Sequence, residues 1–158
     1  MATIFEKQYG MSGAFHCVHR GVDGQVKDEW IIENLNVNSG LAFMAGALSG
    51  DEAAPDDMKY IAVGEGVVAA DPTDTALGSE VETRATGVQS RITTTVADDT
   101  YQSVGTITFT GARAVTEYAL FNQLALGGTM LCRAVSAVKN MATDETLTIT
   151  YKEIFTDV

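Results

Sequence analysis

The sequence predicts a mainly β fold: an antiparallel β-sandwich or flattened barrel that carries one short α-helix. The first observation is the alternation of apolar residues and threonines over 146–151, which is the period of a half-buried strand. The second is a pair of glycine-bearing turn signals at 23–24 and 127–128, which favour hairpins between antiparallel strands. The third is that a single segment has helical spacing. Short strands, tight turns and one helix are together typical of sandwiches and barrels.

The chain has 158 residues, of which 46% are hydrophobic and 20% charged, so we expect one globular domain with a core of its own. Its formal net charge is −11. Such a surface repels phosphate backbones and anionic membranes, and we therefore expect neither nucleic acid nor a membrane as partner. A basic protein surface is its natural electrostatic complement.

The two cysteines, Cys17 and Cys132, each lie in an apolar, strand-like run and are expected to be free, buried thiols. The first residues lack the basic and then apolar pattern of a leader. We therefore expect the protein to stay in a cytoplasm or in particles assembled there.

Residues 1–13 are expected to form an N-terminal arm that precedes a single β domain over 14–158. The arm shows no apolar periodicity. Its large apolar side chains therefore gain burial only by lying on another surface. These side chains are Ile4, Phe5, Tyr9 and Met11.

One helix is expected over about 38–49. Its apolar positions, spaced i, i+3, i+4 and i+7, are Leu41, Met44, Ala45 and Leu48. Asn38 or Ser39 is positioned to cap the first turn, and Gly50 suits the left-handed residue that ends a helix. Because glycines inside the segment weaken the helix, packing of the apolar face should hold it.

The remaining apolar runs predict seven to nine short strands. The loop over 64–78 is long, and a long loop in a compact domain is usually functional; one turn of helix is expected within it at 73–77. The expected strands cover 14–22, 25–32, 58–63, 80–96, 101–110, 116–121, 130–138 and 146–151. The expected core consists of Leu41, Met44, Leu48, Ile61, Val63, Leu77, Ile107, Phe109, Leu120, Phe121, Leu147 and Ile149.

No group of residues has the spacing of a catalytic or metal site, so we expect no enzyme activity, no cofactor and no bound metal. His16 and His19 are three apart on a predicted strand and should face opposite ways, which prevents them from holding one ion. Asp71, Asp74 and Glu80 resemble a glycosidase carboxylate group in composition only, because no aromatic sugar platform accompanies them.

The most informative run lies in the middle of the chain. A buried strand ends in the sequence Gly-Glu-Gly at 64–66, an Asp-Thr-Ala-Leu turn follows at 74–77, and then come Glu80 and Arg84. A carboxylate and a guanidinium at this spacing can form a bidentate ion pair. Two alternatives remain open for that pair: it pins the loop, or it contacts another subunit.

This run resembles a family of small virion structural proteins of tailed bacteriophages. Later elements fit the same family pattern, namely Glu117 followed by a Leu-Phe pair, a strand at 128–133 and a closing strand at 147–151. The resemblance extends from about residue 26 to 151.

The resemblance implies a non-enzymatic virion protein, above all a capsid decoration (cement) protein that stabilises the head by binding across capsomers. A tail, collar or baseplate/fibre component is the alternative, and a carbohydrate-binding β-sandwich module is a second one. The implied partners are the major capsid protein or other virion proteins, together with further copies of this chain, a trimer being favoured. The implied location is the virion, assembled in the host bacterial cytoplasm. The expected interface residues are Ile4, Phe5, Tyr9, Met11, Glu65, Asp71, Asp74, Glu80 and Arg84.

Overall fold

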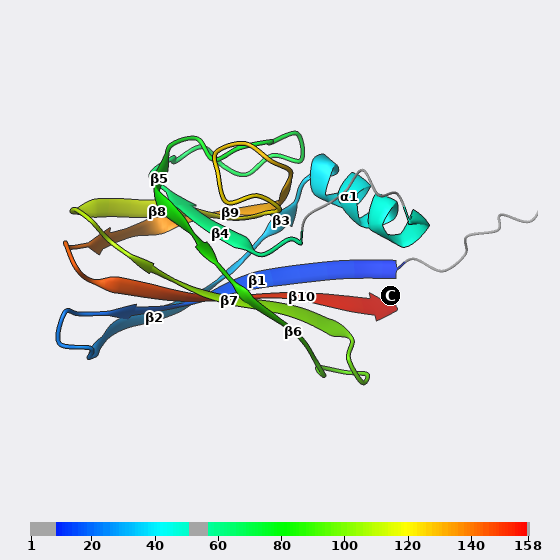
Figure 1. Cartoon of the computed structure of the whole chain (residues 1–158), viewed down its shortest axis with the longest axis horizontal. Coiled ribbons are helices and arrows are strands. Elements are labelled where there is room, and N and C mark those ends of the chain that lie inside the picture. The colour runs from blue at the N-terminus through cyan, green and yellow to red at the C-terminus, as the bar shows by residue number, and fades with distance from the viewer. Residues whose placement is uncertain (1–8, 51–56, 158) are drawn as a thin grey trace, which may run out of the picture.

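The structure is a computed structural model that describes residues 9–50 and 57–157. Within these residues, ten strands form two antiparallel five-stranded sheets that face each other, and one helix lies at one end (Figure 1). The mainly β prediction is confirmed. The arrangement is a sandwich of two open sheets, not a closed barrel, and it has more strands than the seven to nine expected.

The first sheet has the strand order β2-β1-β10-β7-β6. Its members are β1 (Tyr9–Arg20), β2 (Val26–Glu33), β6 (Val88–Ile92), β7 (Thr100–Thr108) and β10 (Thr146–Asp157). The predicted hairpin at 23–24 joins β1 to β2. β1 and β10 pair along their whole length, with Tyr9 opposite Asp157 and Arg20 opposite Thr146. The expected arm is therefore wrong for residues 9–13, which belong to the sheet, and residues 1–8 lie outside the described part of the chain.

The second sheet has the order β3-β9-β8-β4-β5. Its members are β3 (Leu35–Asn36), β4 (Tyr60–Gly64), β5 (Glu80–Thr86), β8 (Arg113–Phe121) and β9 (Met130–Met141). The predicted hairpin at 127–128 joins β8 to β9, and both of its glycines have positive φ.

The segment 80–96, predicted as one strand, is two strands in different sheets. The chain leaves the second sheet after β5, crosses at Gly87, and enters the first sheet as β6. The Gly87 N–H donates to the carbonyl of Lys59 at 2.7 Å. A Cβ at this position would lie 1.9 Å from the Ser103 hydroxyl, so the crossing needs glycine.

The helix α1 (Asn38–Ser49) has the predicted bounds and ends in the predicted way, with Gly50 in the left-handed conformation at φ 73°. The predicted capping is wrong. The residue before the first turn is Val37, which makes no side-chain cap, and the Ser39 hydroxyl donates instead to the Met130 carbonyl. At Gly40 a Cβ would lie 2.2 Å from the Leu131 carbonyl oxygen, so the helix begins in close contact with β9.

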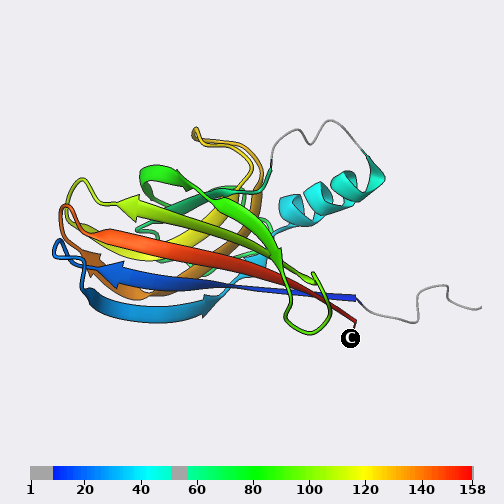
Figure 2. The same ribbon diagram turned by 60° about the horizontal axis from the view of Figure 1, so that its bottom comes forward.

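Nine of the twelve expected core residues are buried: Ile61, Val63, Leu77, Ile107, Phe109, Leu120, Phe121, Leu147 and Ile149. The three exceptions are the helix residues. Leu41 and Leu48 are exposed, at 45% and 88%, and Met44 is half-buried. The reason is the position of α1 beside the end of the sandwich (Figure 2). Phe43 and Met44 are the helix residues that pack against the core.

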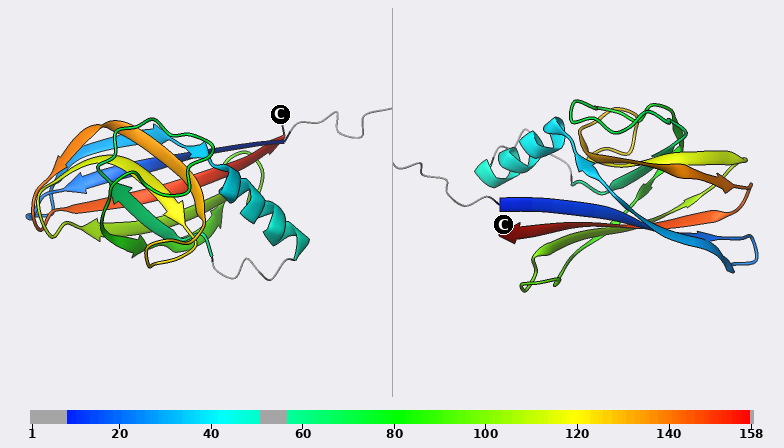
Figure 3. Two further views of the ribbon diagram at one scale, coloured as in Figure 1. Left: turned by 90° about the horizontal axis from the view of Figure 1, so that it is seen from above. Right: turned by 180° about the vertical axis from the view of Figure 1, so that it is seen from behind.

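The second sheet is buried on both faces. Tyr118 and Leu120 of β8 point into the interior between the sheets, whereas Ala119 and Phe121 point outward into a smaller apolar cluster. That cluster is completed by Val37, Ala62, Leu77 and Met130. Two irregular segments, 65–79 and 122–129, stand over this outer face (Figure 3). The helical turn expected at 73–77 is absent.

Candidate functional site: two anchored loops on the second sheet

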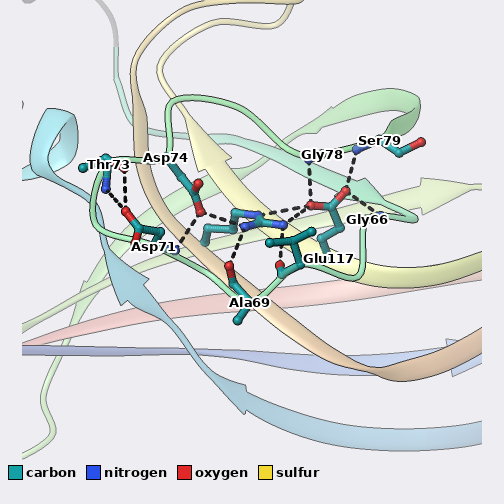
Figure 4. Close-up of polar contacts among 10 residues, drawn as sticks. Gly66, Ala69, Asp71, Thr73, Asp74, Gly78, Ser79 and Glu117 are labelled. Carbon is teal, nitrogen blue, oxygen red and sulfur yellow. Dashed lines mark hydrogen bonds and ion pairs between the residues drawn. The ribbon is translucent and has the colours of Figure 1, made fainter.

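We call the outer side of the second sheet, with loops 65–79 and 122–129, the loop face. Its centre is Glu117 of β8, whose side chain is 0% exposed. Its carboxylate accepts hydrogen bonds from three backbone N–H groups of loop 65–79: Gly66 at 2.7 Å, Gly78 at 2.9 Å and Ser79 at 2.8 Å (Figure 4). One side chain therefore holds both ends of the loop.

Arg133 of the neighbouring strand β9 completes this anchor. Its Nη2 and Nε donate to Oε2 of Glu117 at 2.7 and 3.1 Å. The same guanidinium pairs with Asp74 at 2.7 Å and donates to the carbonyls of Val68 and Ala69 at 2.9 and 3.3 Å. Arg133 thus fixes the middle of loop 65–79, and Glu117 fixes its two ends.

The ion pair is stable in its charged form. Burial raises the pKa of Glu117, but the N–H groups of Gly78 and Ser79 and the Arg133 guanidinium outweigh it, so that pKa lies below its ordinary value. Burial lowers the pKa of Arg133, and the two carboxylates beside it outweigh that effect and raise it. A buried pair whose remaining hydrogen-bonding positions are filled is rigid, and losing either member leaves an uncompensated charge.

The Gly-Glu-Gly sequence at 64–66 is explained by the same carboxylate. A Cβ on Gly64 would lie 2.5 Å from Oε1 of Glu117, and a Cβ on Gly66 would lie 2.4 Å from it. Real Cβ atoms do not approach an atom so closely. Glycine is therefore required for the backbone to reach the buried anion, as it is wherever a main chain closely approaches another group.

A second ion pair anchors the other loop. Arg84 pairs with Glu80 in bidentate fashion at 2.7 and 2.9 Å, and its Nη1 donates to the carbonyls of Gln123 and Gly127 at 2.8 and 2.9 Å. Its guanidinium also stacks 3.6 Å from the centre of the Phe121 ring. Within one chain this pair pins loop 122–129, not the loop over 64–78. A contact of the pair with another subunit stays a prediction.

An irregularity in β5 brings Glu80 and Arg84 together. Glu82 between them has φ 60°, and the register with β4 shifts so that Val81 faces Val63 while Ala85 faces Ile61. The extra residues bulge out of the strand. Two side chains four apart, which a regular strand would separate, can then meet.

The other expected interface residues lie in different parts of the molecule. Glu65 accepts the Ala114 N–H at 2.8 Å, and Asp71 accepts the N–H and hydroxyl of Thr73 at 2.8 and 2.5 Å. Together with Asp74, these carboxylates bind groups of their own chain. Met11 belongs to β1 of the first sheet and lines a cleft beside α1, so it is not part of the loop face. Of the remaining three, Tyr9 begins β1, while Ile4 and Phe5 lie outside the described residues.

The anchored loops expose apolar side chains to solvent. Val67, Val68 and Leu126 are 77%, 75% and 78% exposed, and Leu124 is 47% exposed. Apolar side chains held out on well-anchored loops are typical of a binding surface. Glu117 and Arg133 were not among the residues predicted from the sequence to form a site. The signal was present, because each is a charge inside an otherwise apolar strand, and a buried charge needs a partner.

The histidines face opposite sides of β1 as predicted. His16 bonds an exposed carboxylate at 2.6 Å, and His19 bonds the buried Glu145 at 2.7 Å. Cys17 and Cys132 are free and buried, as expected. Within residues 9–50 and 57–157, no cluster of three or more potential metal ligands occurs. The helix found in this part of the chain is too short to cross a membrane.

Comparison of the chain with protein-family models, with curated proteins and with solved structures gave no match. The geometry itself therefore defines the class: a two-sheet β-sandwich that presents two loops on buried ion pairs.

Proposed function

We propose that this chain is a non-enzymatic structural protein of a tailed-bacteriophage virion that decorates the capsid and stabilises the head by binding across capsomers. The proposed partners are the major capsid protein or other virion proteins, and further copies of the chain. A tail, collar or baseplate/fibre position is the alternative within the same class.

The observation that carries this proposal is the convergence of the phage-like motif on the loop face. Glycines at 64 and 66, Glu80, Arg84 and Glu117 are spread over more than fifty positions of sequence, yet all anchor the two loops. The residues that gave the resemblance thus build the surface from which Val67 and Leu126 project.

Such a surface suits attachment to a large assembly. Loops that are already anchored lose little conformational entropy on binding, so more of the buried apolar area counts toward affinity. The net charge of −11 favours a basic partner and would guide orientation. On a shell, a modest interface per copy is multiplied by the symmetry of the lattice.

The location is tested by imaging phage particles from the strain that encodes the chain, with a gold-labelled antibody against it. Label over heads supports the proposal. Label confined to tails supports the alternative position, and particles without label exclude both. A carbohydrate-binding module would instead bind purified bacterial glycans and leave particles bare.

The surface is tested by binding to particles from which this protein has been stripped. Val67→Asp/Val68→Asp should reduce occupancy strongly, whereas Val22→Asp, an equally exposed valine at 73% in the β1–β2 hairpin, should not. Melting curves check that all proteins are folded. Equal occupancy for both variants would show that the loop face is not the contact.

A further inference from the structure

A second surface lies at the other end of the molecule. There the paired ends of β1 and β10 lie beside α1 (Figure 1). A cleft of about 420 Å³ is lined by residues from all three elements. Its walls include Met11 and Phe155, which are directly opposite each other in the sheet, and Phe43, Met44 and Met58. The lining of this cleft is mainly apolar, and an exposed apolar surface rimmed by polar residues is typical of a binding site.

Two charged side chains at the cleft have no ion-pair partner among the described residues. Arg91 of β6 and Asp98 both line it, and neither side chain forms an ion pair there. The occupant should therefore combine large apolar side chains with one acidic and one basic group. Methionines in the lining adapt to the shape of such side chains.

The chain itself contains a segment with this chemistry. The sequence Ile4-Phe5-Glu6-Lys7 places two large apolar residues directly before an acid and a base. It lies just upstream of Tyr9, where β1 begins, and Met11 of the same strand lines the cleft. We propose that residues 4–7 of one copy bind in this cleft of a second copy, with Ile4 and Phe5 inside and Glu6 and Lys7 at Arg91 and Asp98.

The direction of β1 favours a second copy over the same one. Residues 9–11 are already paired with residues 155–157 of β10, so this part of the chain cannot turn back toward α1. Residues 1–8 contain no glycine, proline, asparagine, aspartate or serine, the residues that reverse a chain. The four residues from Tyr9 to Phe5 span about 13 Å when extended, which would carry Phe5 away from its own cleft and toward a neighbour.

This contact does not depend on the proposed virion role, because it concerns the purified protein alone. One segment and one cleft per copy form a head-to-tail contact, which closes into a ring when the rotation between copies allows it.

The test is a disulfide between two singly substituted proteins. Phe5→Cys protein is mixed with Ala47→Cys protein, since Ala47 is an exposed residue of the cleft wall, and oxidised with copper phenanthroline. The native Cys17 and Cys132 are buried and do not compete. We expect roughly tenfold more linked dimer than with Val22→Cys in place of Ala47→Cys, because docking raises the local thiol concentration to about the millimolar range.

If the segment of the same copy fills the cleft, or if no segment of this chain does, the experiments give different results. An intramolecular link in dilute Phe5→Cys/Ala47→Cys protein would mean that the segment fills its own cleft, and would overturn the proposal. Ile4→Ser/Phe5→Ser should shift the mass in solution from oligomer to monomer, whereas Val22→Ser should leave it unchanged. No excess linkage and no change in mass would also overturn the proposal.

Discussion

Arg133 donates two hydrogen bonds to a single oxygen of Glu117, at 2.7 and 3.1 Å, on the face of the second sheet that points away from the sandwich interior. In an antiparallel sheet that face is commonly solvated. Here loop 65–79 covers it, with Leu77 packed on Phe121 at one side and the ion pair beneath the loop at the other. The loop is thus held by an apolar contact and by buried charge together.

Removing the buried charge should destabilise the whole domain. Glu117→Gln leaves Arg133 buried without its anion and weakens the bonds to the loop N–H groups, so we expect the free energy of unfolding to fall by about 3–5 kcal/mol. Chemical denaturation measures this. The matched control is Glu29→Gln, which removes an exposed carboxylate paired with His16 and should cost under about 1 kcal/mol. Similar losses for both variants would contradict the anchoring role.

The close approach of Gly66 to Glu117 predicts a specific glycine effect. Gly66→Ala places a Cβ against Oε1 of Glu117 and should cost about 1–3 kcal/mol. The carboxylate cannot easily move aside, because three backbone N–H groups and Arg133 hold its two oxygens in position. Gly111→Ala is the control, because nothing lies within 4 Å of its Cβ. Melting temperatures compare the two. A Gly66→Ala protein as stable as Gly111→Ala would mean that the carboxylate can move aside.

The buried carboxyl of Glu153 should behave in the opposite sense to that of Glu117. Burial raises its pKa, and its partners are neutral: the Asn36 amide at 2.7 Å and the Tyr151 hydroxyl. The folded protein then holds this proton to higher pH than the unfolded chain does, so stability should fall as pH rises above 4.5 through the folded pKa. Glu153→Gln should remove that fall and be at least as stable as the wild type at neutral pH. Thermal melts between pH 5 and 8 measure it, and a destabilised variant at neutral pH would contradict the assignment.

Glu145 should contribute to stability mainly above its unfolded pKa. Lys27, the Ala142 N–H and His19 lower its pKa from 4.5 to about 2. Its contribution is complete above pH 4.5 and is lost as pH falls toward 2. Urea unfolding at a series of acidic pH values should show Glu145→Gln less stable than the wild type at pH 6, with the difference shrinking over that window. A constant difference would contradict the linkage.

The loss of stability on truncating a side chain to alanine should distinguish core residues from the exposed residues of the helix. Phe109→Ala and Ile149→Ala remove fully buried side chains and should each cost about 2–5 kcal/mol. Leu48→Ala, at a position expected from the sequence to be core but 88% exposed, should cost under about 0.5 kcal/mol. Denaturant midpoints with unchanged slopes give these values. A large loss for Leu48→Ala would place the helix in a contact that one copy does not contain.

Much of the fold was predictable from local patterns. The alternation over 146–151, the turns at 23–24 and 127–128, and the helix with Gly50 at its end all have the predicted form. These features depend on backbone conformations that a few neighbouring residues prefer, so they can be identified in a short window of sequence. For the candidate site, the sequence indicated loop 64–78 and the pair Glu80–Arg84, but neither the anchor beneath that loop nor the loop that the pair holds.

The sequence by itself determined the β class, the hairpins and the helix of this protein, because turn and strand preferences act over a few residues. Only the tertiary structure decided that the chain changes sheets at Gly87 and that Leu41 and Leu48 face solvent. It also decided that Glu117 meets Arg133 beneath a loop about forty to fifty residues earlier in the chain. The physical reason is that burial of a charge or an apolar face depends on what covers it. Here the cover comes from segments far away in the chain, and no local pattern specifies their position.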